Sequence, residues 1–334
     1  MKKILLIQTA FIGDVILATP LIEKLHQHYP DARIDFLLRK GNESLLKNHP
    51  FLNEVLIWNK KQNKTKNLFS LLLQIRRKKY DVVINSQRFL STGLLTAFSD
   101  GKQRIGFDKN PLSFFFTKKI KHQIADNQQL THEVQRNHAL ISHLTDAPPA
   151  LPKLYPSDSD FEKIKELNLA PIKKQYICIA PTSVWFTKQL PAEKWLKLIA
   201  KLPLQNDIYL LGAPSDMTAC EKIKRASNHP KIHNLAGQLS LLQSAALMRD
   251  AMMNYVNDSA PLHLASAMNA PVTGVFCSTI PSFGFTPLSS VRRVLETKEK
   301  LDCRPCGLHG FKKCPKGHFR CSNVFDDESR AYFP

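Results

Sequence analysis

The sequence contains no long apolar run, and this absence argues against a membrane helix. Such a helix needs roughly 18 or more consecutive apolar residues, and no stretch of the 334 residues approaches that length. The start of the chain imitates a signal peptide, because Lys2 and Lys3 precede the run ILLIQTAFIG. However, Gln8 and Asp14 interrupt the run, and no small-x-small cleavage site follows. We interpret the segment as a buried strand and expect a cytoplasmic protein.

Acidic residues are scarce relative to basic ones. The chain has 47 lysines and arginines against 28 aspartates and glutamates, which gives a formal net charge of +19. This balance favours polyanionic partners such as an anionic membrane surface or a phosphorylated substrate, although solvated lysines of a basic proteome would give the same balance. The sequence contains no helix-turn-helix, RNA-binding aromatic signature or zinc-finger spacing, so we expect no nucleic-acid partner.

Short apolar runs alternate with amphipathic segments along the chain. The strand-like runs are 2–8, 33–39, 54–58, 80–87 and 103–107 in the first half and 176–181, 207–213, 231–237, 253–258 and 271–277 in the second. Helical patterns lie between them, for example over 14–28 and 66–79. Strands separated by helices of this length imply right-handed crossovers and parallel sheets.

A proline-rich segment, 146–156 (DAPPALPKLYP), interrupts the alternation and is the best linker candidate. We therefore predict an α/β protein with two Rossmann-like, doubly wound parallel-sheet domains, residues 1–150 and 151–334. The two domains enclose a cleft at the carboxyl ends of their strands, where ligands bind in such sheets.

The turn after the first strand, TAFIGDVILATP (9–20), holds one glycine and beside it Asp14. Turns that grip a phosphate usually carry several glycines, which let backbone N–H groups approach it. The G-x-G-x-x-G of nicotinamide-dependent oxidoreductases is also missing. Asp14 could cap the following helix. At a cleft wall it could instead act as a general base toward an attacking hydroxyl.

The loop after 176–181 offers hydroxyls and a cation, namely Thr182, Ser183, Thr187 and Lys188. Lysine binds phosphate as a point charge. A solvated surface lysine is the alternative. The position of Lys188 after a strand of the second domain favours a ligand contact.

A third stretch, Asn257-Asp258-Ser259 followed by Pro261, is typical of a helix N-terminus, whose free N–H groups can bind an anion. Ser259 could both cap the helix and bind a phosphate oxygen. Asp258 could be a simple cap or, beside a diphosphate, could bind sugar hydroxyls. His263 alone would more often be a hydrogen-bonded core residue.

These three stretches, TAFIGDVILATPLI, APTS…TKQLPAEKW and VNDSAPLHLASAMNAPV, resemble the bacterial ADP-heptose:lipopolysaccharide heptosyltransferases, which are family 9 glycosyltransferases with the GT-B fold. The resemblance runs from Lys3 to about Cys321, and the Gly-Asp of the first loop combined with D-[ST]-x-x-x-H is fairly specific. It implies an inverting, metal-independent transfer of heptose from ADP-heptose to the inner core of lipopolysaccharide, on a Kdo-lipid A or heptosyl acceptor.

The resemblance also implies residue roles. Asp14 matches the catalytic base, and Lys188 matches the lysine that neutralises the donor diphosphate. Asp258 matches the acid that holds the sugar, and Ser259 and His263 lie in the motif around the diphosphate. No cofactor is required for catalysis, because ADP-heptose is a substrate.

The acceptor implied by the resemblance is an anionic lipid precursor, which suits the basic first half of the chain. Its candidate contacts are Arg88, Arg104, Arg136 and His138, and no motif selects among them. We expect a monomer that associates peripherally with the inner face of the cytoplasmic membrane.

Two departures from the family pattern concern the transferred sugar more than the reaction class. Val184-Trp185-Phe186 is bulkier than expected for its loop, and Ala260 replaces a common glycine. One alternative is transfer of another nucleotide-activated sugar to a cell-envelope glycan. Another is a sugar-nucleotide-binding protein without activity, for which loss of Asp14 would be the sign; Asp14 is present.

Four of the seven cysteines crowd into one segment, as Cys303-x-x-Cys306, Cys314 and Cys321. Four thiolates at such spacing could hold a tetrahedral zinc, which would be structural because no coordination position stays open. A reduced, packed set of thiols is the alternative.

Overall fold

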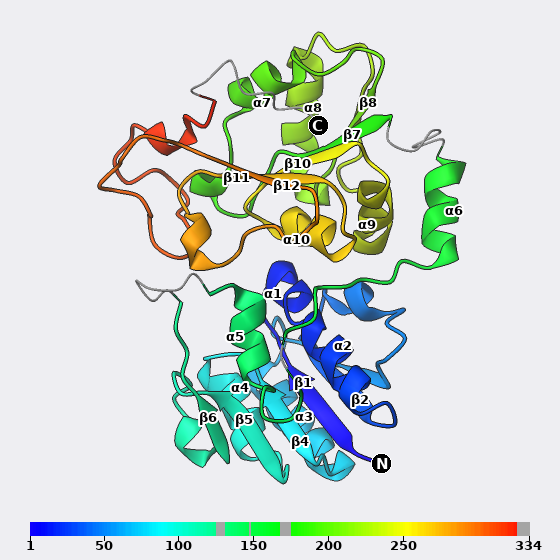
Figure 1. Ribbon diagram of the computed structural model, residues 1–334, viewed down its shortest axis with the longest axis vertical. Helices are drawn as coiled ribbons and strands as arrows, with labels where there is room; N and C mark the ends of the chain where they lie inside the picture. Colours follow the sequence, from blue (N-terminus) through cyan, green and yellow to red (C-terminus); the bar gives the residue numbers. More distant parts are fainter. Residues whose placement is uncertain (125–130, 147, 168–174, 326–334) are drawn as a thin grey trace. The chain divides into compact units, whose positions relative to one another are not determined.

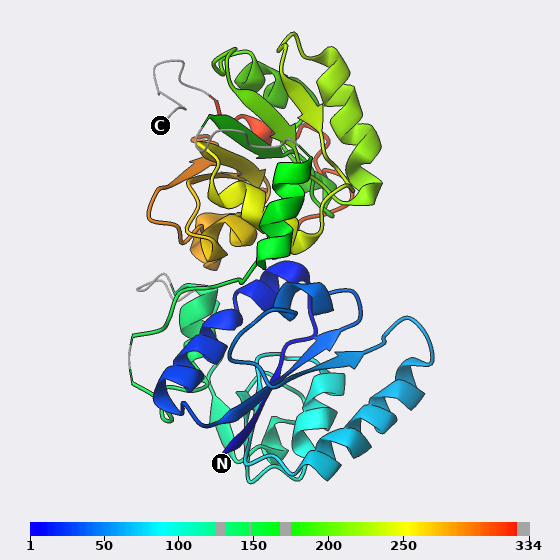
Figure 2. The same ribbon diagram turned by 90° about the vertical axis from the view of Figure 1, so that its right-hand side faces the viewer.

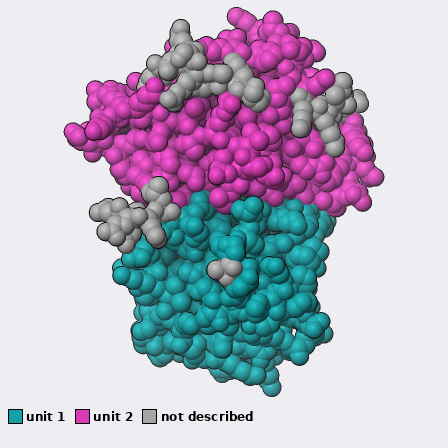
Figure 3. Space-filling view, in the orientation of Figure 1, with its two compact units in different colours: residues 1–155 teal, residues 156–334 magenta. Residues whose placement is uncertain are grey.

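The structure, a computed structural model, describes residues 1–124, 131–146, 148–167 and 175–325. The chain divides into two compact units, Met1–Tyr155 (unit 1) and Pro156–Pro334 (unit 2), shown in Figure 3. Each unit contains one parallel six-stranded sheet, which confirms the predicted α/β class with two parallel sheets. Figures 1 and 2 show helices on both faces of each sheet.

The sheet of unit 1 has β1 (Lys3–Ile7) near its centre, because the KILLI strand is apolar on both faces. Across the sheet the order is β3 (Glu54–Trp58), β2 (Arg33–Arg39), β1, β4 (Val82–Asn85), β5 (Gln103–Phe107) and β6 (Lys118–Ile120). The helices of this unit in the described residues are α1 (Ile12–Ile16), α2 (Thr19–His28), α3 (Lys64–Lys78), α4 (Leu90–Ala97) and α5 (Glu133–Ala139).

The sheet of unit 2 is built in the same way around β7 (Tyr176–Ala180). Its order is β12 (Arg292–Glu296), β11 (Val272–Phe276), β10 (Met253–Asn257), β7, β8 (Asp207–Leu210) and β9 (Ile232–Asn234). The helices of its described part are α6 (Asp158–Glu166), α7 (Ala192–Ile199), α8 (Met217–Ala226), α9 (Leu241–Arg249) and α10 (Ala260–Ala267).

In both sheets the strand order reverses beside the first strand. The reversal lies between β1 and β4 in unit 1 and between β7 and β10 in unit 2. In doubly wound sheets, ligands bind outside the carboxyl ends of the strands at this point. The topology therefore selects the loops after β1, β4, β7 and β10 as the places to look for a site.

The structure differs from the sequence expectation at two edge strands and one helix. The strands β6 (KKI) and β12 (RRVLE) lie at sheet edges and are rich in charge, so they carry no apolar run that would reveal them. The single helix expected over 14–28 is divided into α1 and α2. Pro20 lies in the first turn of α2, where a missing N–H costs no helical hydrogen bond.

The cysteine-rich segment packs on the loop after β7. The N–H of Thr187 donates to the carbonyl of Phe311 (3.1 Å), and the N–H of Phe311 donates to Oγ1 of Thr187 (2.7 Å). Gly310 has φ +75°, and a Cβ there would lie 2.8 Å from Oγ1 of Thr187, so only glycine fits. Arg304 donates to the carbonyls of Cys277 and Thr279, at 2.8 Å each. Hydrogen bonds thus attach this segment to the loop that carries Lys188.

Candidate active site

Asp14 lies in the loop and helix that follow the central strand of unit 1. It occupies the third position of α1, and its Oδ2 accepts a hydrogen bond from the backbone N–H of Phe11 (3.1 Å). The carboxylate therefore caps its own helix, and it is only partly buried. A capping role does not remove it from the carboxyl edge of the sheet, where the topology places ligands.

The loop that carries Asp14 is fixed by its neighbours through Thr9, which is fully buried. Oε1 of Gln87, in the loop after β4, accepts from both the N–H (3.0 Å) and the hydroxyl (2.6 Å) of Thr9. Nζ of Lys60, in the loop after β3, donates to the carbonyl oxygen (2.8 Å) and to Oγ1 (2.9 Å) of Thr9. The loops after β3 and β4 thus hold the turn after β1 in place beside Asp14.

Two cations on the β2–β3 side of this edge were not predicted. Arg39, the last residue of β2, lies over the ring of Phe11 (4.7 Å), and Lys60 lies over the ring of Trp58 (4.6 Å). Burial, together with the positive charges of Arg39 and Lys64, lowers the pKa of Lys60 to about 8. Burial also lowers the pKa of Arg39, and the nearby Asp14 opposes that shift. Their positions at or just after strand ends were the signal that could have identified them.

Two of the four predicted acceptor contacts lie on the opposite side of Asp14. Nε of Arg136 pairs with the buried carboxylate of Glu133 (2.7 Å) in α5. Burial raises the pKa of Glu133 despite Arg136, and the charge of Asp14 adds to the increase. Arg88, in the loop after β4, is exposed. Burial of His122 and the positive charges of Arg88 and Arg136 lower the pKa of His122 to about 4. Arg88 and Arg136 therefore both act on His122.

The other two predicted acceptor contacts lie elsewhere. Arg104 is at the amino end of β5, and its guanidinium donates to the carbonyls of Gly101 (2.8 Å) and Phe115 (3.3 Å). His138 lies further along α5 and is buried; burial and the charge of Lys24 lower its pKa. These contacts and this burial give both residues a role in the fold of unit 1, and their contact with an acceptor stays a prediction.

In unit 2 the structure brings Lys188 and Asp258 together from the loops after β7 and β10. Nζ of Lys188 lies 2.7 Å from Oδ2 of Asp258, and the two side chains are only 15% and 6% exposed. The hydroxyl of Thr279 donates to the same carboxylate oxygen (2.6 Å). A buried ion pair is costly to desolvate and needs such additional hydrogen bonds. Neither residue is a solvated surface charge.

The remaining predicted donor contacts lie around this pair. Thr182 and Ser183, partly exposed, begin the loop after β7. Ser259 is the N-cap residue of α10, but its hydroxyl makes no capping hydrogen bond. Thr187 is buried and its hydroxyl is bonded to Phe311, and His263 is buried within α10. Of this set, Thr182, Ser183 and Ser259 are the hydroxyls with access to a ligand.

The sequence pattern predicts Asn257 only as part of a helix start, and the structure gives it a second role. Its Oδ1 accepts from the backbone N–H of Leu190 (2.9 Å), and its Nδ2 lies 3.4 Å from the carbonyl oxygen of Thr182. The side chain therefore ties the loop after β7 to the end of β10. These are the two segments that carry Lys188 and Asp258.

No group of three or more His, Cys, Asp or Glu side chains in the described part of the chain is arranged to hold a metal ion. In the cysteine-rich segment, Sγ of Cys303 lies 3.8 Å from Nε2 of His318, and the thiol of Cys306 donates to the carbonyl of Cys303 (3.0 Å). The residues do not form a metal site in this arrangement, and the predicted zinc stays a prediction.

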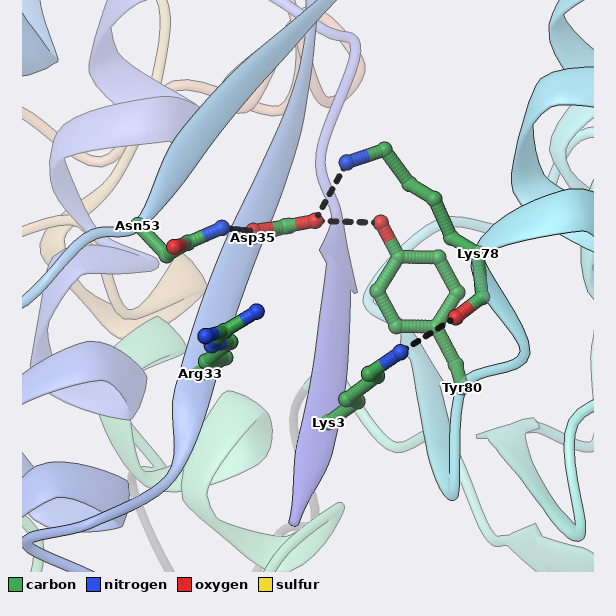
Figure 4. A pocket seen from close by; sticks show the side chains of 6 residues that line it. All are labelled: Lys3, Arg33, Asp35, Asn53, Lys78 and Tyr80. Carbon is green, nitrogen blue, oxygen red and sulfur yellow. Dashed lines mark hydrogen bonds and ion pairs between the residues drawn. The ribbon is translucent and has the colours of Figure 1, made fainter. Parts of the chain in front are cut away.

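A small pocket of about 90 Å³ lies at the other end of the unit 1 sheet (Figure 4). It is lined by Lys3, Arg33, Asp35, Asn53, Lys78 and Tyr80. The buried carboxylate of Asp35 accepts from Nδ2 of Asn53 (2.8 Å) and from the hydroxyl of Tyr80 (2.5 Å), and Nζ of Lys78 lies 3.2 Å away. These contacts satisfy the carboxylate, so the pocket is explained as a structural network.

Comparisons with known proteins identify the family of the chain. The model of glycosyltransferase family 9 (heptosyltransferase) matches residues 68–307. Lipopolysaccharide heptosyltransferase 3 of Escherichia coli K12 is 31% identical over 276 residues, which cover 80% of each chain.

Solved structures show the same fold. The structure of E. coli ADP-heptose lps heptosyltransferase II has a TM-score of 0.77 at 23% identity and covers 92% of this chain and 96% of its own. The structure of E. coli heptosyltransferase WaaC with ADP has a TM-score of 0.70 at 21% identity, with 87% and 92% covered. The chain therefore belongs to glycosyltransferase family 9, the heptosyltransferases of lipopolysaccharide core biosynthesis, as the sequence motifs predicted.

Proposed function

We propose that this protein is an inverting lipopolysaccharide heptosyltransferase that moves heptose from ADP-heptose to an inner-core acceptor, Kdo-lipid A or a heptosyl residue, with Asp14 as general base. The observation that carries the proposal is the position of Asp14 on a rigid turn at the carboxyl end of the central strand. The second support is the cation and helix start at the equivalent edge of unit 2. The structure of E. coli heptosyltransferase WaaC with ADP suggests the donor nucleotide.

The donor diphosphate would be bound by Lys188 and the N-terminus of α10. Lys188 is paired with Asp258, and an arriving diphosphate would compete for its ammonium group. Asp258 would then be available to accept hydrogen bonds from sugar hydroxyls. Ser259 fits the same site, since its hydroxyl is not used to cap α10. A lysine with a helix dipole can stabilise the charge on departing ADP without a metal.

The acceptor would approach from the edge that carries Asp14. Its hydroxyl oxygen attacks the anomeric carbon of the donor sugar, the bond from that carbon to the phosphate oxygen breaks, and ADP leaves with the electron pair. Asp14 takes the hydroxyl proton. A single displacement of this kind inverts the anomeric centre. Arg39 and Lys60, on the β2–β3 side, would bind anionic groups of the acceptor.

Replacement of Asp14 tests the base. Asp14→Asn keeps an oxygen that can cap α1, so the fold and ADP binding should persist. Transfer should fall by about 10²- to 10⁴-fold, the usual share of general base catalysis. The exposed Asp31→Asn is the matched control and should leave the rate unchanged. Near-normal transfer by a purified, folded Asp14→Asn enzyme would exclude this role.

Replacement of Lys188 tests the donor site. Lys188→Ala should weaken ADP binding by roughly tenfold or more, because hydrogen bonds to charged groups contribute about 1.5–3 kcal/mol. Calorimetric titration with ADP measures the effect, and the exposed Lys197→Ala in α7 is the control. Since the substitution leaves Asp258 buried without its lysine, Lys188→Ala/Asp258→Asn distinguishes lost stability from lost affinity. ADP affinity equal to wild type in both variants would contradict the assignment.

Titration of Lys60 tests the acceptor site. As the pH rises through about 8, Lys60 loses its proton, so kcat/KM for an anionic acceptor should fall. Lys60→Arg, whose guanidinium stays charged, should remove this decline. The neighbouring exposed Lys61→Arg should keep the wild-type pH profile. An unchanged decline in the Lys60→Arg enzyme would show that another group titrates.

Two measurements address metals. Transfer should continue at full rate in EDTA, because the proposed chemistry uses a lysine and a helix dipole; inhibition by EDTA that magnesium reverses would contradict it.

If the cysteine-rich segment holds the predicted zinc, protein purified without chelators should contain about one zinc per chain, lost in Cys303→Ser/Cys306→Ser. Far less zinc in folded protein would leave the segment held by its contacts with Thr187 and the core.

A further inference from the structure

The helix α3 is amphipathic, yet it presents large apolar side chains on its outer face. Leu68, Leu71 and Ile75 are buried against unit 1. On the other face Phe69 and Leu73, one turn apart, are 53% and 56% exposed. Figure 2 shows α3 at the periphery of unit 1. A surface helix normally exposes polar residues on this face, so the two apolar side chains need an explanation.

Cations flank these apolar side chains along one line of the helix. Lys66, Phe69, Leu73 and Arg77 follow each other at spacings of three or four residues and therefore lie on one face. Lys66 and Arg77 are exposed, and within the described residues neither forms an ion pair. Leu73, Arg77 and Lys78 also line a shallow surface hollow together with Ser70 and Gln74.

The charge around this face has one sign. The segment 60–79 contains no acidic residue, and its basic residues are Lys60, Lys61, Lys64, Lys66, Arg76, Arg77, Lys78 and Lys79. Acidic residues from outside the segment neutralise only part of this positive charge: Asp100 pairs with Arg76, and Asp35 and Glu54 pair with Lys78. A helix with apolar residues between unpaired cations is typical of one that lies in a membrane interface.

The location of the helix agrees with a lipid partner. The start of α3 is close to the loop after β3, because Nδ2 of Asn67 donates to the carbonyl of Asn59 (3.3 Å), and Lys60 of that loop is bonded to Thr9 beside the Asp14 edge. A surface that binds α3 would therefore lie next to the edge where the acceptor is proposed to bind. No helix of the described residues is long and apolar enough to cross a membrane.

We propose that the outer face of α3, formed by Lys66, Phe69, Leu73 and Arg77, docks unit 1 on an anionic phospholipid surface. The apolar pair enters the boundary between headgroups and acyl chains, and the cations contact lipid phosphates. The choice of a lipid surface as the partner rests on the proposed function, but binding of α3 to vesicles does not require heptose transfer.

Flotation of the full-length protein with two kinds of vesicle tests the docking face. One kind contains equal parts of phosphatidylglycerol and phosphatidylcholine, and the other contains phosphatidylcholine alone. Wild type should bind the acidic vesicles more tightly, and Lys66→Gln/Arg77→Gln should weaken this binding by about 30-fold, since each cation near an anionic surface contributes roughly fivefold. Phe69→Ser/Leu73→Ser should weaken binding at low and at moderate salt, because the apolar contribution is not screened.

The matched control is Lys197→Gln/Lys222→Gln, which removes two exposed lysines from α7 and α8. It should bind like wild type; equal weakening by the control would show that net charge and not α3 carries the binding, and would overturn the proposal. Wild type that binds both vesicles equally, or neither, would also overturn it.

A transfer assay separates this proposal from the proposed function. With a water-soluble core oligosaccharide acceptor, the α3 variants should turn over like wild type, and they should lose rate only with acceptor embedded in acidic vesicles. Absence of transfer by wild type, with intact α3-dependent vesicle binding, would overturn the function and leave the docking face standing.

Discussion

The reversal of strand order beside β1 and β7 is the constraint on which the site depends. At this point the helices that follow neighbouring strands leave the sheet toward opposite faces, so the loops between them separate and leave space at the carboxyl edge. The chain places its unusual polar residues in these loops. Asp14 follows β1, Gln87 and Arg88 follow β4, Lys188 follows β7, and Asp258 follows β10.

Each unit then uses a buried polar network to fix its loops. In unit 1, Thr9 is held by Gln87 and Lys60, so the turn before Asp14 has little freedom to move. In unit 2, Asn257 and the Lys188–Asp258 pair connect the loops after β7 and β10. These contacts fix the loops before substrate arrives. Preorganised groups stabilise a transition state well because they need not reorient during the reaction. The pairing of Lys188 with Asp258 adds a specific feature under the proposed function, because the carboxylate that a diphosphate would displace is itself suited to bind sugar hydroxyls.

The parallel sheets and the family could be predicted from the sequence, because both depend on local signals. Apolar runs reveal buried strands, as in KILLI and YICIA, and short motifs follow strand ends. Arg39 and Lys60 were missed because no motif contains them, and only the assembled sheet brings them to Asp14. Arg104 and His138 were named for their charge alone; Arg104 lies at the amino end of β5, where its guanidinium donates to the carbonyl of Gly101, and His138 is buried within α5. The strands β6 and β12 were missed because edge strands do not need apolar runs, and these two are rich in charge.

The distribution of charge in unit 1 connects the two proposals. Arg39 and Lys60 are partly buried and lie over aromatic rings, and the charge of Arg39 helps to lower the pKa of Lys60. An anion that binds them therefore relieves a repulsion already present in the fold. Lys66 and Arg77 are exposed and separated by apolar side chains, so they gain little from one small anion and more from a surface that presents many phosphates. The first arrangement suits one acidic group of an acceptor sugar, and the second suits a plane of lipid headgroups. If both proposals hold, an acceptor made of acidic sugars on a lipid would present both at once and would use the two basic regions of unit 1 together.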